Sequence, residues 1–261
     1  MTAHVTAATV FGPAGFTSGD LGEAGLVSDD LVASALTMRG LRPLSRTARL
    51  AMVAAAAVWP QGSSGGRDAV VLGSARSSLA PLAEFVQVAA EHGPDQVFPM
   101  AFPNTVVSVH VGYVATLLGI TGPAVAVCGE HAGLEAVVEA CALLDGDRAD
   151  RALAIGADAA EPTVLAGEPG AAEAAAAVRL SAVREAGCLA RITGWWTAPS
   201  YDDLPLGVRP AAPGVAAGPF GAASGAAALV AAAHAVAADG RPRTVAGRSG
   251  VYGVAAVRLV P

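Results

Sequence analysis

The sequence predicts a layered α/β protein, and three observations favour that class. Short apolar runs typical of buried strands alternate with segments of helical period along the 261 residues. An expected strand at 124–128, helix at 132–144 and strand at 152–156 form a unit that implies a parallel crossover. No short repeat and no compositional linker divides the chain, so a single domain over residues 1–261 is the economical interpretation.

The elements of the first half follow from local signals. Ser45 is a typical helix N-cap before an apolar pattern of helical spacing, and Pro60 ends that helix. The segment 104–118 is rich in β-branched residues, so packing must hold it as a helix. In chain order we expect a strand at 5–11, a loop at 14–30, a helix at 46–59, a strand at 68–73 and helices at 80–92 and 104–118.

The second half is expected to continue this alternation. The run at 124–128 is wholly apolar, which is typical of a strand buried on both faces. Residues 197–219 form a Pro- and Gly-rich loop that is long enough to be functional or to mark a deletion. The remaining expected elements are a helix at 132–144, strands at 152–156, 174–180 and 190–196, a helix at 222–238 and a strand at 251–260.

The composition excludes several functions. Charged residues make up only 15% of the chain, the net charge is −6 and the mean hydropathy is +0.51. All 16 basic residues are arginines, which excludes a P-loop lysine, a Schiff base and a lysine general base. The acidic balance also argues against a nucleic-acid partner.

Two uncharged stretches raise the question of a membrane segment. No Asp, Glu, Lys or Arg lies between Asp95 and Glu130, or between Arg209 and Asp239. Prolines and glycines interrupt both stretches, whereas a span needs about 20 continuous apolar residues. We therefore interpret both as buried in protein and expect no membrane association.

The residues that usually mark an enzyme are absent or poorly placed. Cys128, Cys141 and Cys188 have neither metal-ligand spacing nor an even count, which favours free thiols in a reducing cytoplasm and no metal or cofactor. Zincin, Cys-x-x-Cys, nucleophile-elbow and dinucleotide motifs are also absent. What remains is the junction at 127–134, where an apolar strand turns into a helix whose first N–H groups favour a nucleophile or an oxyanion.

Residues 122–133 resemble the nucleophile segment of the β-ketoacyl synthases of the thiolase superfamily, in which Gly-Pro leads into a strand that ends at the reactive cysteine. Counted from Gly122, that cysteine falls on His131. The stretch 129–134 is more similar still to chain length factors of type II polyketide synthases, where a glutamine often replaces the nucleophile. The resemblance extends to 44–50, 69–73, 102–112, 147–157, 221–227 and 250–257.

The resemblance implies a thiolase-like layered α-β-α-β-α fold that is abridged in the C-terminal half, from about residue 174. The loop with the synthases' first catalytic histidine is missing between Trp196 and Gly218, and the closing motif at 250–257 lacks the second histidine. Decarboxylative condensation needs a thiolate and both histidines. The implied function is therefore a non-catalytic chain length factor that forms a heterodimer with a catalytic ketosynthase. Through that complex it would meet the acyl carrier protein and shape the acyl-chain tunnel of a polyene or highly reducing type II system.

Two other functions stay open. His131 could be the acid or base of a malonyl-carrier-protein decarboxylase, in the role that glutamine has in related subunits, or a polar filler at a helix N-terminus. The same helix and strand could instead form the homodimer of a binding protein.

By family position, a stripe on the 104–118 helix would face the partner and line the tunnel, although valine-rich stripes are also typical of core packing. Cys128 is expected to pack inside its strand, and Glu130 to cap the helix at 132 or to pair with an arginine of the partner. Arginines 39, 42, 46 and 49 could receive an acidic carrier protein or be solvated surface. The candidate tunnel and interface residues are Val106, Val109, His110, Tyr113, Leu117, Cys128, Glu130 and His131.

Overall fold

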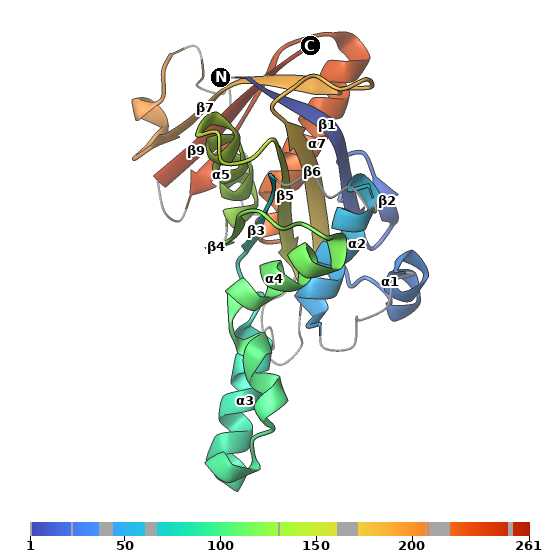
Figure 1. The fold of residues 1–261 in the computed structure, drawn as a ribbon, viewed down its shortest axis with the longest axis vertical. Helices are drawn as coiled ribbons and strands as arrows, with labels where there is room; N and C mark the ends of the chain where they lie inside the picture. Colours follow the sequence, from blue (N-terminus) through green and yellow to red (C-terminus); the bar gives the residue numbers. More distant parts are fainter. Residues whose placement is uncertain are drawn as a thin grey trace.

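The computed structural model describes residues 2–21, 23–36, 44–60, 67–129, 131–160, 172–206, 208, 220–249 and 253–261. They form a nine-stranded mixed sheet with helices against its faces (Figure 1). The strands are β1 (Ala3–Gly12), β2 (Gly15–Thr17), β3 (Asp68–Ser74), β4 (Ala124–Cys128), β5 (Arg151–Asp158), β6 (Ala174–Ser181), β7 (Ala190–Ala198), β8 (Arg243–Ser249) and β9 (Gly253–Val260). The helices are α1 (Asp29–Ala35), α2 (Arg46–Val58), α3 (Leu79–His92), α4 (Val107–Leu118), α5 (Ala132–Asp145) and α7 (Ala222–Asp239), with 3₁₀ turns η1 (Pro94–Gln96), η2 (Pro99–Thr105) and η3 (Tyr201–Asp203).

The strand order β4-β3-β5-β6-β1-β7-β9-β8 divides the sheet into two parts joined by a short ladder. β3 pairs in parallel with both β4 and β5, which confirms the predicted parallel crossover through α5. β6 runs antiparallel to β5 and to β1. Only residues 3–5 of β1 pair with β7, and β9 and β8 continue the second part in antiparallel order.

Helices α5 and α7 lie between the two parts of the sheet and form the main core with both. On β3, Ala69 and Val71 face this core, whereas Val70 and Leu72 face a second core that contains α2 and α4. Because both faces of the central strands are covered, the residues between their ends are apolar or glycine. The layered α/β class is therefore confirmed. The outer face of β7, β8 and β9 packs on side chains of the 198–208 segment.

Most expected elements are confirmed, with differences at their ends. The Ser45 hydroxyl accepts the N–H of Ala48 at 3.2 Å, as expected of the N-cap of α2. The helix expected at 104–118 begins later, because residues 99–105 form η2 and the chain bends by 94° before α4. Three elements, α1, β2 and β8, were not predicted, because they are short and weakly apolar. Residues 207 and 209–219 of the expected long loop lie outside the described residues.

The prediction that residues 124–128 form a strand buried on both faces is wrong in its burial. This strand, β4, lies at the edge of the sheet and pairs only with β3. Ala124 and Cys128 are exposed and the residues between them are half-buried. The described residues thus cover its wholly apolar sequence only in part.

The segment from Leu79 to Val106, here called the arm, extends away from the sheet (Figure 1). It consists of α3, η1 and η2, and Ala80 is the one buried residue of α3. Phe85 of α3 packs edge-on against Phe102 of η2, with ring centroids 5.9 Å apart. The arm is therefore held together mainly by its own contacts.

In the part of the chain that the structure describes, one helix has the length and apolar composition of a membrane span, and so has the bent pair of η2 and α4. The first is α7, whose 18-residue window is 56% buried inside the protein. Leu229, Val230 and Val236 of α7 belong to the main core, so this helix packs as a core helix.

Candidate functional site

The chain passes from β4 into α5 at the junction that the sequence singled out. Gly129 has a φ of 148°, in the positive range that favours glycine. His131 is the N-cap residue of α5; it is half-buried, and its side chain caps no backbone N–H. Among the described residues, no hydrogen bond joins its imidazole to another side chain. Glu130 lies outside the described residues.

Glycines allow several backbones to meet beside this junction. A Cβ on Gly73 of β3 would collide with the carbonyl of Ala132, and one on Gly133 would collide with the carbonyl of Ala222. A Cβ on Gly156 of β5 would meet the same carbonyl at 2.7 Å. The first turns of α5 and α7 can therefore lie against each other and against both strands only because these positions lack side chains.

Asp158, at the end of β5, is a buried carboxylate that the sequence analysis did not single out. It accepts hydrogen bonds from the Ser74 hydroxyl at 2.7 Å and from the backbone N–H groups of Ala75, Arg76 and Ala222 at 3.0, 2.8 and 2.6 Å. Burial raises the pKa of Asp158, and these hydrogen bonds oppose that shift. The carboxylate joins the end of β5 to the segment after β3 and to the first turn of α7, so it positions the backbone around α5.

The candidate stripe on and before α4 divides into two faces. Val106 is 38% exposed, and Val109, Tyr113 and Leu117 are half-buried. His110 differs, since it is completely buried on the core side together with Val111, Val114 and Leu118.

The complete burial of His110 agrees with core packing, the alternative that the sequence left open for this stripe. Neither ring nitrogen has a hydrogen-bond partner of good geometry among the described residues. Burial lowers the pKa of His110 to about 4, and an interaction with the backbone of Asn104 offsets this only in part. The imidazole is therefore neutral near pH 7.

Cys128 corrects another expectation, because it is exposed at the end of the edge strand instead of packed inside it. It lies beside Ser74 in the β3–β4 ladder, three residues before His131. Cys141 is buried in α5, and burial raises the pKa of its thiol. Cys188 is half-buried and donates to the carbonyl of Ala190 at 3.1 Å.

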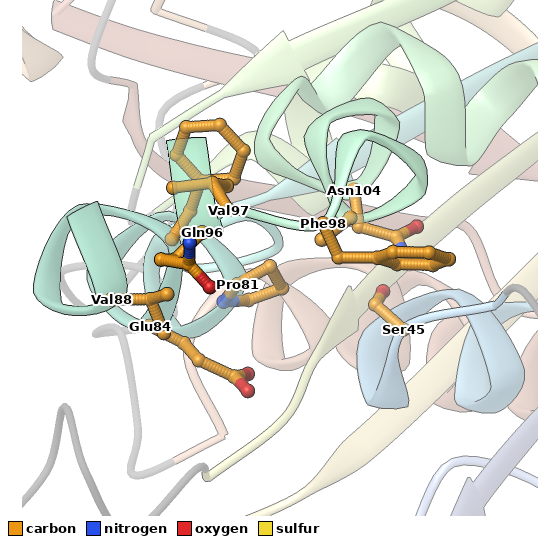
Figure 2. A pocket seen from close by; sticks show the side chains of 10 residues that line it. Ser45, Pro81, Glu84, Val88, Gln96, Val97, Phe98 and Asn104 are labelled. Atoms are coloured by element: carbon orange, nitrogen blue, oxygen red, sulfur yellow. The ribbon is translucent and has the colours of Figure 1, made fainter. Parts of the chain in front are cut away.

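A cavity of 480 Å³ lies between α3, the η1–η2 segment and the start of α2 (Figure 2). Phe85, Val88, Val97, Phe98 and Ala101 supply its apolar lining. Polar groups come from Ser45, Glu84, Gln96 and Asn104. The cavity thus lies between the arm and the N-terminal end of α2.

Arg46 is engaged inside the protein, which corrects its place among the arginines that could receive a carrier protein. Its guanidinium donates to the buried Glu173 carboxylate at 3.2 and 2.8 Å and to Asp29 at 2.5 Å. Glu173 also accepts the N–H of Val27 at 3.0 Å. The Nε atom of Arg49 is buried. Residues 39 and 42 lie outside the described residues.

Comparisons with known proteins identify the fold. No protein-family model and no curated protein sequence matches the chain. Among solved structures, the chain is similar to the ishigamide ketosynthase/chain length factor, with a TM-score of 0.77 and 18% identity over 100% of this chain and 99% of that chain. It is similar to the type II polyketide ketosynthase complex AntDE:AntF, in which the acyl carrier protein is present, with a TM-score of 0.77 and 13% identity over 99% of both chains.

A third similar structure is the ketosynthase ApeO with its chain length factor ApeC from Xenorhabdus doucetiae, with a TM-score of 0.59 and 15% identity over 100% of both chains. These matches define the class of fold as the thiolase-like fold of ketosynthases and chain length factors. Within that class, each of these three structures contains a ketosynthase, and two of them also contain a chain length factor. The fold class expected from the resemblance is confirmed.

Proposed function

We propose that this chain is a chain length factor that forms a heterodimer with a catalytic ketosynthase in a type II polyketide synthase. One observation carries the proposal. The edge strand β4, the half-buried face of α4 and residues 96–106 of the arm carry no charged side chain, and the described residues leave them partly uncovered. Large exposed apolar surfaces mark sites that another protein covers.

The arm supplies the largest exposed apolar side chains of this surface. Phe98 and Met100 are each 69% exposed and Phe102 is 56% exposed. Aromatic residues and methionine are enriched at protein interfaces, and charged residues are depleted from their centres. The absence of charge between Asp95 and Glu130, which first suggested burial, supports an interface.

The edge of the sheet supports the same partner surface. β4 presents a row of backbone groups on the side away from β3, and no described strand pairs with it there. Soluble proteins usually protect such an edge with charge, proline or a covering segment. β4 contains none of these within Ala124–Cys128, so a partner subunit is the covering we propose.

The residue before α5 indicates which subunit would be catalytic. His131 lies where the resemblance places the nucleophilic cysteine of the synthases. Because an imidazole replaces the thiolate there, this chain lacks the group that would hold the acyl chain. The ketosynthase partner would therefore carry out condensation and receive the acyl carrier protein. This chain would supply one wall of the tunnel through Val106, Val109, Tyr113 and Leu117.

Further features belong to this proposal. The second half, from about residue 174, would be an abridged version of the family's second half. The product is a reduced or polyene chain, no cofactor is needed, and the complex acts in the cytoplasm.

Co-expression of this chain with the ketosynthase encoded next to it tests the interface. Met100→Glu places a charge on the arm, and Val183→Glu makes the matched change at a residue that is also 69% exposed but lies in the turn after β6. We expect Met100→Glu to reduce the recovered complex at least about tenfold, because a charge would be desolvated at the interface, while Val183→Glu leaves it unchanged. Equal recovery of both variants would contradict the proposed interface.

Decarboxylation is a second candidate function, favoured by the half-buried imidazole of His131 at the α5 N-terminus. The purified chain alone would then release carbon dioxide from malonyl carrier protein. The loss of mass of the carrier protein, measured by mass spectrometry, would report this release. Loss of that release in His131→Ala would support the decarboxylase. If the wild-type chain releases no carbon dioxide, decarboxylation is excluded and the chain length factor role remains.

A further inference from the structure

A second cavity lies at the end of the sheet opposite to His131. It has a volume of 260 Å³ and is lined by His4, Arg184, Cys188, Ala190, Arg191 and Pro261. His4 pairs with Ser181, which in turn pairs with Arg151 at the amino end of β5. His131, by contrast, follows the carboxyl end of β4, which is parallel to the β3–β5 pair. The cavity is therefore separate from the proposed interface and from the α5 junction.

Four segments of the chain build the walls of this cavity. They are the start of β1, the turn after β6, the start of β7 and the residue after β9. His4 lies directly opposite Arg191 in the antiparallel β1–β7 ladder, so their side chains share one face of the sheet. The N–H of Leu189 donates to the carbonyl of Val5 at 2.8 Å and fixes the turn against β1. The sheet, instead of a loop alone, thus sets the position of the lining groups.

The charged side chains of the lining are the two arginines, Arg184 and Arg191. Burial lowers the pKa of His4, and the charges of Arg184 and Arg191 lower it further, so both guanidinium groups lie within electrostatic reach of the imidazole. Neither arginine forms an ion pair with a described acidic side chain. The acidic residue of the same turn, Glu185, is engaged by Arg179 at 3.1 Å. Two positive charges around a concave site favour an anion.

We propose that this cavity binds a small phosphate-bearing anion. Planar guanidinium groups match phosphate oxygens. The Cys188 thiol donates to the Ala190 carbonyl, so the 3.8 Å contact between His4 Nδ1 and the Cys188 sulfur uses the one N–H of the neutral imidazole, and the two guanidinium groups supply the donors for the anion. The volume is below the range of about 300–1,000 Å³ typical of drug-sized ligands, so inorganic phosphate or a small phosphate ester fits. This inference does not depend on the proposed function.

Calorimetric titration of the full chain in a low-salt buffer without phosphate tests the proposal. The probes are inorganic phosphate and glycerol 3-phosphate, which separate a free phosphate from an ester. We expect saturable binding of at least one probe, weakened at least about tenfold by Arg184→Ala and by Arg191→Ala. Arg248→Ala is the matched control, because it removes an exposed arginine from the far end of the β8–β9 ladder. Binding to this control should equal that of the wild type.

Two results would overturn the inference. One is the absence of saturable binding of both probes. The other is an equal loss of affinity in Arg248→Ala, which would show a general effect of net charge. Thermal unfolding shows whether Arg191→Ala is folded. If it is not, Arg184→Ala still tests the proposal, because Arg184 is exposed in the turn after β6 and its replacement should not affect folding.

Discussion

The Asp158 carboxylate accepts the backbone N–H of Ala222 at 2.6 Å, and this one contact joins the end of β5 to the first turn of α7. The same carboxylate accepts the Ser74 hydroxyl and two further N–H groups after β3. Because the first turn of α7 lies against Gly133 of α5, Asp158 indirectly holds the helix that begins at His131. Because four donors bind this buried carboxylate, even a small chemical change to it should lower the free energy of unfolding.

Replacing Asp158 by asparagine should destabilise the protein by about 2 kcal/mol. The amide NH₂ would face backbone N–H groups and leave at least one buried donor unpaired. Urea unfolding followed by circular dichroism measures the change. Asp30→Asn, at an exposed position in the first turn of α1, is the control. A free energy of unfolding equal to that of the control would contradict the role of Asp158.

Gly133→Ala should be strongly destabilising, by about 3 kcal/mol, because its Cβ would collide with the Ala222 carbonyl and separate α5 from α7. Gly112→Ala in α4 is the matched change, since its Cβ would meet no atom within 4 Å. There, alanine should stabilise the helix by up to about 1 kcal/mol. Thermal unfolding of both variants checks the pair, and a mild effect at position 133 would refute close helix contact.

The stability of the protein should fall with acid because of His110. Its folded-state pKa of about 4 lies below its ordinary value of 6.5, so the unfolded state binds more protons between those values. Stability from neutral His110 is present above pH 6.5 and is lost as the pH falls toward 4. From pH 7 to pH 5 this amounts to about 2 kcal/mol.

His110→Leu isolates this contribution, because leucine keeps an apolar side chain at the site without a titrating group. Urea unfolding at pH 7 and at pH 5 should show a smaller loss for the variant than for the wild type. Equal losses in the two proteins would show that the buried imidazole does not carry the pH dependence.

The apolar pattern was sufficient to predict most elements of the fold. The β3, β5 and β6 strands are short apolar runs because helices cover both of their faces, and Ser45 caps α2 as its residue type indicates. The β4 run has the same appearance but lies at an uncovered edge. A single sequence cannot distinguish burial within a chain from burial against another chain, and this explains the error.

The site was predicted in part. The His131 junction follows from a strand, a glycine and a helix in sequence, and the structure brings these together as expected. Asp158 was missed because its donors come from residues 74–76 and 222, far away in the chain. The only local signal was a lone acidic residue at the end of a buried strand. For His110, helix spacing alone left tunnel lining and core packing both open, and the structure buries its side chain in the core of this chain.

Tyr113 should affect product length if the half-buried face of α4 lines the proposed tunnel. Tyr113→Ala, assayed in the reconstituted complex, should lengthen the product by one or more extension units without abolishing condensation. Thr116→Ala, at an exposed position on the same helix, should leave the length unchanged. The masses of the released chains give the result, and identical products from Tyr113→Ala and wild type would remove Tyr113 from the tunnel.

The central claim is that this chain is one half of a heterodimer whose other half is catalytic. Native mass spectrometry of the chain co-expressed with its neighbouring ketosynthase tests it most directly. The account predicts a complex with one copy of each chain, whose condensing activity is lost when either is omitted. A stable monomer or homodimer that ignores the ketosynthase would contradict it.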